Sequence, residues 1–255
     1  MLLTADVGNT ETVLGVFDGP ELAQTWRLST QPERTADELA LDFAGLLEHR
    51  GLSLEKLSGF CVASVVPDIT HQLREFADRY LSIVPVIVEP GTKTGVSVLT
   101  DNPREVGADR IVNTLAAFER FGGPAIVVDF GTGTNFDVVS AKGEFLGGVI
   151  APGLQISAAT LVQRAARLTR VELEAPPSVI GTSTVAAIQS GLVFGTAGEV
   201  DGIVERIRAE LGSATTIATG GLAPVVIPHC RTIDHHEPFL TLEGLRLVHE
   251  KNVDD

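Results

Sequence analysis

Cysteine and long apolar runs are both scarce in this sequence of 255 residues. The two cysteines, Cys61 and Cys230, lie far apart with no C-x-x-C pair, which argues against a disulfide framework and a zinc site and fits a reducing cytoplasm. No apolar run approaches the roughly 18 residues of a membrane span. The first residues also lack the charged and apolar regions of a secretory signal. We therefore expect neither a signal peptide nor a membrane span.

Positive charge is scarce as well, because 19 Lys and Arg residues stand against 33 Asp and Glu residues, giving a net charge of −14 at pH 7. This balance argues against nucleic acid or an anionic membrane as a partner. It does not exclude a small anionic ligand, because backbone N–H groups, metal ions and single arginines decide such binding locally. The G-x-x-x-x-G-K-[ST] pattern of P-loop proteins is missing too.

The residues that are present favour an α/β protein of one large or two medium domains. Hydrophobic residues make up 44% of the chain, and short apolar runs alternate with helical patterns. The patterns predict strands at 21–29, 60–66, 84–88, 125–129, 144–150 and 217–219, and helices at about 36–51, 69–80, 111–121, 154–168, 184–211 and 240–249.

The stretch Ala5-Asp6-Val7-Gly8-Asn9-Thr10-Glu11-Thr12 lies between two apolar runs, which predicts an N-terminal β-hairpin with a polar turn. Gly8 lets another group approach the backbone closely, and a turn of this kind binds anions, most often phosphate. Asp6 would repel a phosphate unless a cation lies between them. The turn therefore indicates a metal–phosphate site, although a single D-x-G-N-T is also typical of an ordinary hairpin.

A second stretch repeats this plan in mid-chain, where Val127-Val128-Asp129-Phe130-Gly131-Thr132 leads into another apolar run. Two such hairpins, one at the start of each half, predict a duplicated βαβ-type domain with a cleft between the copies. We expect the halves to cover residues 1–115 and 116–255, with the paired turns holding a phosphate chain.

Asp109 and Arg110 fall at or near the start of a predicted helix, where the helix dipole and free N–H groups favour an anion. On residue type alone, Asp109 is better explained as a helix-end carboxylate paired with Arg110. His235-His236-Glu237 has no metal-ligating partner at helical spacing, so we interpret it as a solvated loop.

Further blocks extend the pattern: DVGNT at 6–10, NPREVGADR at 102–110, DFGT at 129–132, GEFLGGVIAPG at 143–153, ATGGLAP at 218–224 and LTLEGLRL at 240–247. In order and spacing, over essentially the whole chain, these blocks resemble the type III pantothenate kinases of the actin/Hsp70/sugar-kinase fold. The resemblance implies two duplicated domains with mixed sheets, flanking helices and a central cleft. It also implies ATP-dependent phosphorylation of pantothenate to 4′-phosphopantothenate, the first step of coenzyme A biosynthesis.

The resemblance also implies roles for single residues. The positions that match ATP-binding residues are Asp6, Val7, Gly8, Asn9, Thr10, Glu11, Thr12, Val13 and Thr132. The positions that match the pantothenate site are Gly107, Ala108, Asp109, Arg110 and Thr184, with Asp109 as general base. Asp129 matches the ligand of a monovalent cation, potassium or another such as ammonium. Members of the family work as homodimers with Mg²⁺.

The chemistry of these residue types agrees, because an Asp accepts a proton from an alcohol while a neighbouring Arg holds a polar or anionic part of the substrate. Four positions depart from the family pattern: Glu11 replaces Asn, Thr100 replaces Tyr, and the segments Gly133-Thr134-Asn135 and Thr182-Ser183 differ. Two alternatives therefore stay open. One is a non-catalytic paralogue that binds or regulates, and the other is a kinase or phosphohydrolase of the same fold for another small molecule.

Overall fold

The computed structural model describes residues 1–164 and 171–253, and the chain forms two compact units. Unit 1 comprises Met1–Val96, Asp101–Ala116 and Thr241–Asp255, and unit 2 comprises Ser97–Thr100 and Ala117–Leu240. The C-terminal segment therefore packs with the N-terminal half of the chain. None of the helices described has the length and apolarity that crossing a membrane requires.

Unit 1 is built on a five-stranded mixed sheet with the strand order β3-β2-β1-β4-β5. The first three strands are antiparallel, and β4 and β5 continue the sheet in parallel to β1. The strands are β1 (Leu2–Val7), β2 (Glu11–Asp18), β3 (Glu21–Ser29), β4 (Gly59–Ser64) and β5 (Val86–Ile87). Its helical elements are α1 (Ala36–Glu48), η1 (Leu54–Lys56), α2 (Pro67–Phe76), η2 (Ala77–Leu81), η3 (Pro103–Glu105), the first part of α3 (Ala108–Phe121) and most of α7 (Leu240–Val253).

Local sequence explains where α1 begins. Thr35 is its N-cap, and the Thr35 hydroxyl accepts a hydrogen bond from the Glu38 N–H while the Glu38 carboxylate accepts one from the Thr35 N–H. Such a capping box satisfies two backbone donors at once. Losing an N-cap side chain costs about 1 kcal/mol of stability.

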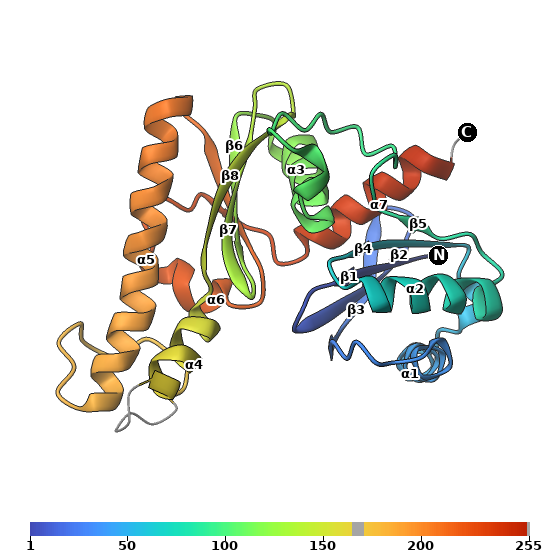
Figure 1. Cartoon of the computed structure of the whole chain (residues 1–255), viewed down its shortest axis with the longest axis horizontal. Helices are drawn as coiled ribbons and strands as arrows, with labels where there is room; N and C mark the ends of the chain where they lie inside the picture. The colour runs from blue at the N-terminus through green and yellow to red at the C-terminus, as the bar shows by residue number, and fades with distance from the viewer. Residues whose placement is uncertain (165–170, 254–255) are drawn as a thin grey trace. The chain divides into compact units, whose positions relative to one another are not determined.

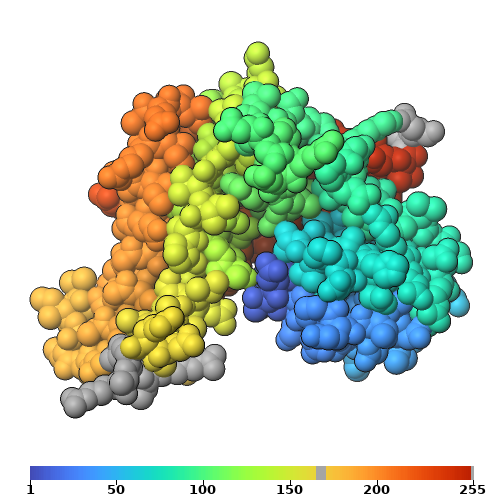
Figure 2. Space-filling view, viewed as in Figure 1, coloured from blue at the N-terminus to red at the C-terminus, as the bar shows by residue number. Residues whose placement is uncertain are grey.

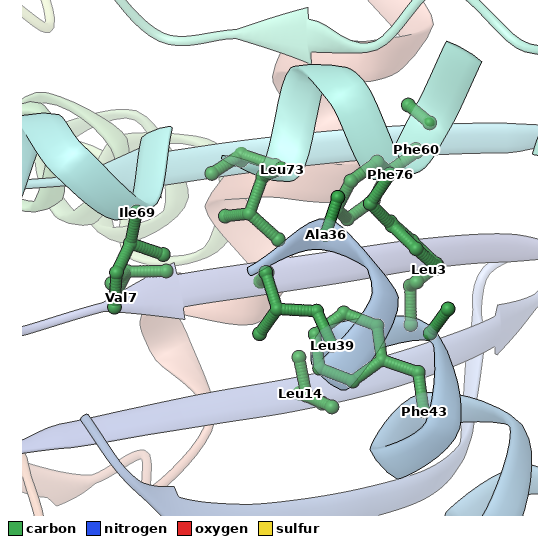
Figure 3. Packing of buried hydrophobic residues seen from close by; sticks show 14 of the residues in the cluster. Leu3, Val7, Leu14, Ala36, Leu39, Phe43, Phe60, Ile69, Leu73 and Phe76 are labelled. Carbon is green, nitrogen blue, oxygen red and sulfur yellow. The ribbon is translucent and has the colours of Figure 1, made fainter. Parts of the chain in front are cut away.

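The core of unit 1 lies between one face of this sheet and helices α1 and α2 (Figure 1). Figure 3 shows its centre, where apolar side chains of β1 and β2 meet those of both helices. The Phe76 ring packs edge-on against Phe43 and Phe60, with centroids 5.1 and 5.8 Å apart. Cys61 is fully buried on β4, and burial raises the pKa of its thiol to about 12.

Helix α7 contacts the same sheet on residues that point away from this core. A β-carbon at Gly15 would lie 2.9 Å from Cδ1 of Leu242, and the Arg246 guanidinium lies over the Phe17 ring at 5.9 Å. Gly15 therefore allows the helix to approach the strand closely. Between them, α1, α2 and α7 contact both faces of the sheet.

Unit 2 repeats the plan with a five-stranded sheet of the order β10-β9-β6-β7-β8. Strands β6, β7 and β8 are antiparallel, and β9 and β10 continue in parallel to β6. The elements are β6 (Ala125–Phe130), β7 (Gly133–Val139), β8 (Phe145–Pro152), α4 (Leu154–Arg164), α5 (Thr184–Leu211), β9 (Thr215–Thr219), α6 (Ala223–Val226), η4 (Ile227–His229) and β10 (His235–His236). Each of β6 to β10 has a counterpart in β1 to β5, so the predicted duplication is confirmed.

Helix α5 runs unbroken for 28 residues beside this sheet (Figure 1), although it contains Gly191, Gly195, Gly198 and Gly202. Each glycine in a helix interior costs about 1 kcal/mol relative to alanine. Burial of Ala197, Val200 and Val204 in the core that α5 shares with the sheet offsets this cost.

Three local predictions need correction. Helix α3 begins at Ala108 rather than at residue 111, the expected helix 69–80 divides into α2 and a π-helical turn, and His235-His236 forms β10 instead of a loop. The histidine pair adds to the sheet because residues 235 and 236 align with β9. The predicted helix 154–168 is seen to Arg164, and its last four residues lie outside the described part.

Candidate active site

The first polar turn joins β1 to β2, as predicted. β1 ends at Val7, β2 begins at Glu11, and the Gly8 N–H donates a 2.9 Å hydrogen bond to the Glu11 carbonyl. Asn9, Thr10 and Glu11 are exposed, Asp6 and Gly8 are partly buried, and Val7 and Thr12 are buried. The turn therefore presents hydroxyl and amide groups at the surface, with the Asp6 carboxylate near the end of β1 and the exposed Glu11 carboxylate at the start of β2.

The end of β3 holds this turn in place. The Thr30 N–H donates to the Thr10 carbonyl at 2.9 Å, and the hydroxyls of Thr12 and Thr30 are 2.9 Å apart. Arg27 forms an ion pair with Glu11. Sequence reasoning considered the turn alone and did not find Thr30 or Arg27, because the register that brings them to the turn depends on a bulge in the pairing of β2 with β3.

The second candidate element is the start of α3, where Ala108, Asp109 and Arg110 form the first turn of the helix. The Arg110 backbone N–H donates to Oδ1 of Asp109 at 2.9 Å. A β-carbon at Gly107 would overlap this carboxylate, so glycine leaves the space in which it lies. Burial raises the pKa of Asp109, and its contacts with Arg110 only partly oppose this shift.

The second polar turn joins β6 to β7 in unit 2. Asp129 is partly buried near the end of β6, the Gly131 N–H donates to the Gly133 carbonyl at 3.0 Å, and Thr132 is exposed. The plan is the same as at the first turn: a carboxylate near the strand end, then a glycine turn with an exposed hydroxyl.

Two glycines from other elements close in on this second turn. A β-carbon at Gly220, which follows β9, would lie 2.5 Å from Oδ1 of Asp129. A β-carbon at Gly153, between β8 and α4, would overlap the Thr132 carbonyl and lie 2.8 Å from the Gly131 carbonyl. The two glycines therefore let the chain pass close to the Asp129 carboxylate and to the Thr132 and Gly131 carbonyls, and we call this group of oxygen atoms the cradle.

This cradle suits a hard cation, because carboxylate and carbonyl oxygens are the ligands such ions prefer. Among residues 1–164 and 171–253, no group of three or more His, Cys, Asp or Glu side chains is placed to hold a metal ion. A cation at Asp129 would therefore take most of its ligands from backbone oxygens, water and bound phosphate. Asp6 offers a comparable single carboxylate at the first turn.

Thr184 lies in the first turn of α5, whose N-cap is Ser183. It lines a hollow of about 600 Å³ between α4 and α5, together with Ser157, Leu161 and neighbouring α5 residues. Neither Asp129 nor Thr132 is among the residues that line this hollow. Of the departures from the family pattern, Thr100 has a buried hydroxyl without a hydrogen-bond partner, and its methyl group lies beside Gly147 of β8.

Within unit 1, the structure thus contains the turn of residues 6–13 and the block of residues 107–110. Within unit 2, it brings Asp129, the turn after it and Gly220 together, and Thr184 lines the hollow between α4 and α5. Both turns combine phosphate-binding groups with a carboxylate, and the start of α3 supplies the partly buried Asp109 carboxylate, which is suited to accept a proton. This set of groups fits transfer of a phosphoryl group to an alcohol.

Comparison with known proteins agrees with this chemistry. A family model described as type III pantothenate kinase matches residues 2–206. A type III pantothenate kinase from Frankia alni is 60% identical over 256 residues, which cover 99% of this chain and 100% of the relative.

Solved structures show the fold. A Baf family protein from Campylobacter jejuni matches with a TM-score of 0.60 at 19% identity, covering 99% of this chain and 100% of that one. A ROK hexokinase from Thermus thermophilus matches with a TM-score of 0.51 at 14% identity, covering 100% and 99%. The two mixed sheets with flanking helices therefore form the actin/Hsp70/sugar-kinase fold that the sequence predicts.

Proposed function

The chain belongs to the type III pantothenate kinase family, and we propose that it transfers the terminal phosphoryl group of ATP to the hydroxyl of pantothenate. The product is 4′-phosphopantothenate, and the reaction opens coenzyme A biosynthesis. Because it consumes ATP, we place the enzyme in the cytoplasm. The remaining steps assign roles to this chain's own residues.

The observation that carries the mechanism is the place of the partly buried Asp109 carboxylate in the first turn of α3. A general base works best when its pKa lies near the working pH, and burial raises the pKa of Asp109 in that direction. In our proposal Asp109 accepts the proton of the substrate hydroxyl as this oxygen attacks the γ-phosphorus. Arg110, Gly107 and Ala108 orient pantothenate, with Arg110 facing its carboxylate or another polar group. Thr184 supplies a further substrate contact.

We assign phosphate binding to each of the two polar turns. Residues 6–13 offer N–H groups and hydroxyls from unit 1, and Thr132 offers its hydroxyl from unit 2. No P-loop lysine is needed, because phosphoryl transfer depends mainly on positioning and on neutralising the phosphate charge. Mg²⁺, held by phosphate oxygens and one or two carboxylates, supplies much of that neutralisation when bound. Asp6 is the carboxylate that we assign to it.

We assign the cradle beside Asp129 to a monovalent cation, potassium or ammonium. Side chains at Gly220 and Gly153 would collide with the Asp129 carboxylate and with the Thr132 and Gly131 carbonyls, so glycine at both positions leaves these oxygens uncovered by a side chain. A cation there would screen Asp129 from the phosphates, and so remove a repulsion that the bare turn would impose.

A homodimer is the assembly that the surface of unit 2 supports. β8 lies at the edge of its sheet, and the segment 97–100 pairs with it only at Phe145 among the described residues. Beyond that point Leu146, Val149 and Ile150 are exposed, Ile150 by 68%. Figure 2 shows this yellow segment at the surface beside the orange α5. Exposed apolar strands of this kind usually mark an interface, and we propose a second copy as the partner.

A coupled assay of ADP release, with and without pantothenate, tests the proposed function, and mass spectrometry of the product identifies the phosphorylated acceptor. We expect ADP release that depends on pantothenate and yields 4′-phosphopantothenate. ATP turnover without that dependence would indicate another acceptor or hydrolysis. Absence of turnover in the presence of Mg²⁺ and potassium would indicate a non-catalytic binding protein.

A further inference from the structure

Glu11 lies in the first phosphate turn, where the family pattern has a neutral residue. Its carboxylate forms an ion pair with the Arg27 side chain. Its Oε2 atom lies 2.8 Å from Nη1 of Arg27 on the neighbouring strand β3. The side chains are 55% and 43% exposed. The pair is therefore open to solvent and to a ligand at the turn.

Strand register puts Arg27 on the same face of the sheet as Asp6. Asp6 is paired with Val13 of β2, and Val13 is paired with Arg27 of β3. Residues paired directly across neighbouring strands point to the same face, and such strands lie about 4.8 Å apart. Asp6 and Arg27 therefore share one row across the sheet, about 10 Å apart at the backbone.

Glu11 stands at the end of that row. It precedes Val13 by two residues on β2, so it faces the same side as Asp6 and Arg27. Two carboxylates and one guanidinium thus share one face where the sheet meets the phosphate turn. The hydrogen bonds of Thr30 to Thr10 and Thr12 hold β3 against this turn, which keeps Arg27 in place relative to it.

The charges of this group bear on nucleotide binding. We have assigned Asp6 to Mg²⁺, which would compensate the charge of Asp6. Without Arg27, Glu11 would add an uncompensated negative charge beside the triphosphate. We propose that Arg27 is a nucleotide-site residue whose guanidinium neutralises Glu11 and so permits Mg–ATP to bind at the turn. The inference rests on the proposed function for the ligand's identity. Arg27 acts through Glu11, as a positioning and neutralising residue rather than as a catalytic one.

Charge-removal variants test the pair by isothermal titration calorimetry with Mg–ATP, and by steady-state kinetics. Arg27→Gln should weaken Mg–ATP binding roughly 3–10-fold, the range of one partly screened charge. Its KM for ATP should rise similarly, with kcat and the KM for pantothenate within about twofold. The defect should shrink at high salt, because added ions screen Glu11.

The double variant Arg27→Gln/Glu11→Gln decides how Arg27 acts. Removing both charges should restore ATP affinity to within about twofold of the unmodified chain. A double variant as weak as Arg27→Gln alone would overturn the proposal, because Arg27 would then contact phosphate directly or serve only structure. Unchanged ATP affinity in Arg27→Gln would overturn it as well.

Arg79→Gln is the matched control, because Arg79 forms half-exposed ion pairs with Asp37 and Glu75 away from the turn. It should leave ATP binding unchanged. The binding measurement also separates this proposal from the proposed function. If the chain binds Mg–ATP but does not phosphorylate pantothenate, the proposed function is wrong. The ATP affinities of the Arg27 variants would still decide whether Arg27 neutralises Glu11.

Discussion

The carboxylate of Asp109 fills the space that a side chain at Gly107 would need. The position of the proposed base therefore depends on the absence of a β-carbon at Gly107. Gly107→Ala should displace the carboxylate and lower kcat by roughly 10²-fold, the cost of misplacing a catalytic group by about 1 Å. Steady-state kinetics on the purified variant would measure this.

Gly45→Ala serves as its control, because nothing lies within 4 Å of a β-carbon at that position in α1. It should leave kcat unchanged and raise stability by about 0.5–1 kcal/mol, since alanine is the better helix former. Full activity in Gly107→Ala would show that the Asp109 carboxylate does not need its present position.

Asp109→Asn should lower kcat by roughly 10²–10⁴-fold while ATP and pantothenate still bind. Because burial raises the pKa of Asp109, the acid limb of kcat/KM in the unmodified enzyme should lie at higher pH than an ordinary Asp gives. A pH profile set by an unshifted carboxyl would argue against this assignment.

Asp109→Asn should raise the thermal stability of the protein at neutral pH, although it lowers kcat. A raised pKa means that folding favours the neutral acid, so the stabilisation is present below the unfolded pKa and is lost as pH rises through the folded pKa. Asp109→Asn is neutral throughout, so it should melt at a higher temperature than the unmodified chain at neutral pH. Thermal melts at several pH values should show this difference shrinking as the pH falls.

Exchange of potassium for sodium should lower the rate, and Asp129→Ala should remove the difference between the two salts. The physical reason is that the cradle at Asp129 is lined by oxygen atoms and needs a cation of fitting size. Rates measured in matched chloride salts decide the matter. Equal rates for the unmodified enzyme would count against a selective site.

Ile150→Asp should convert a dimer into monomers, because it places a charge on the exposed apolar edge strand β8. Light scattering after size exclusion should report a mass near twice the 26.9 kDa of one chain for the unmodified protein, and near that value for the variant. Leu41→Asp, on the exposed face of α1, should stay dimeric. A monomeric unmodified protein would refute the proposed assembly.

Local rules let the sequence determine much of this protein. The capping box of Thr35 and Glu38, the hairpin turns after Val7 and Phe130 and the burial of Cys61 each follow from a few neighbouring residues. The order of sequence blocks determined the family and the fold, because each block stands at its expected spacing. The roles of single site residues stay predictions that the experiments above address.

Contacts between distant segments were decided only by the tertiary structure. Helix α7 packs on β2 through Leu242 and Gly15, which lie more than 200 residues apart. No pattern of neighbouring residues in the sequence predicts this contact. The desolvation that raises the pKa of Asp109 likewise depends on atoms that folding brings around it.

The register of β2 and β3 shows the physical reason most directly. Counted from the turn, where Phe17 pairs with Leu22, regular pairing would put Arg27 opposite Thr12, whose side chain faces the core. The bulge between Val16 and Phe17 shifts the register by one residue, and a shift of one reverses the face to which every side chain points. Arg27 therefore pairs with Val13 and reaches Glu11. The sequence determined that both charges exist, and the bulge decided that they meet.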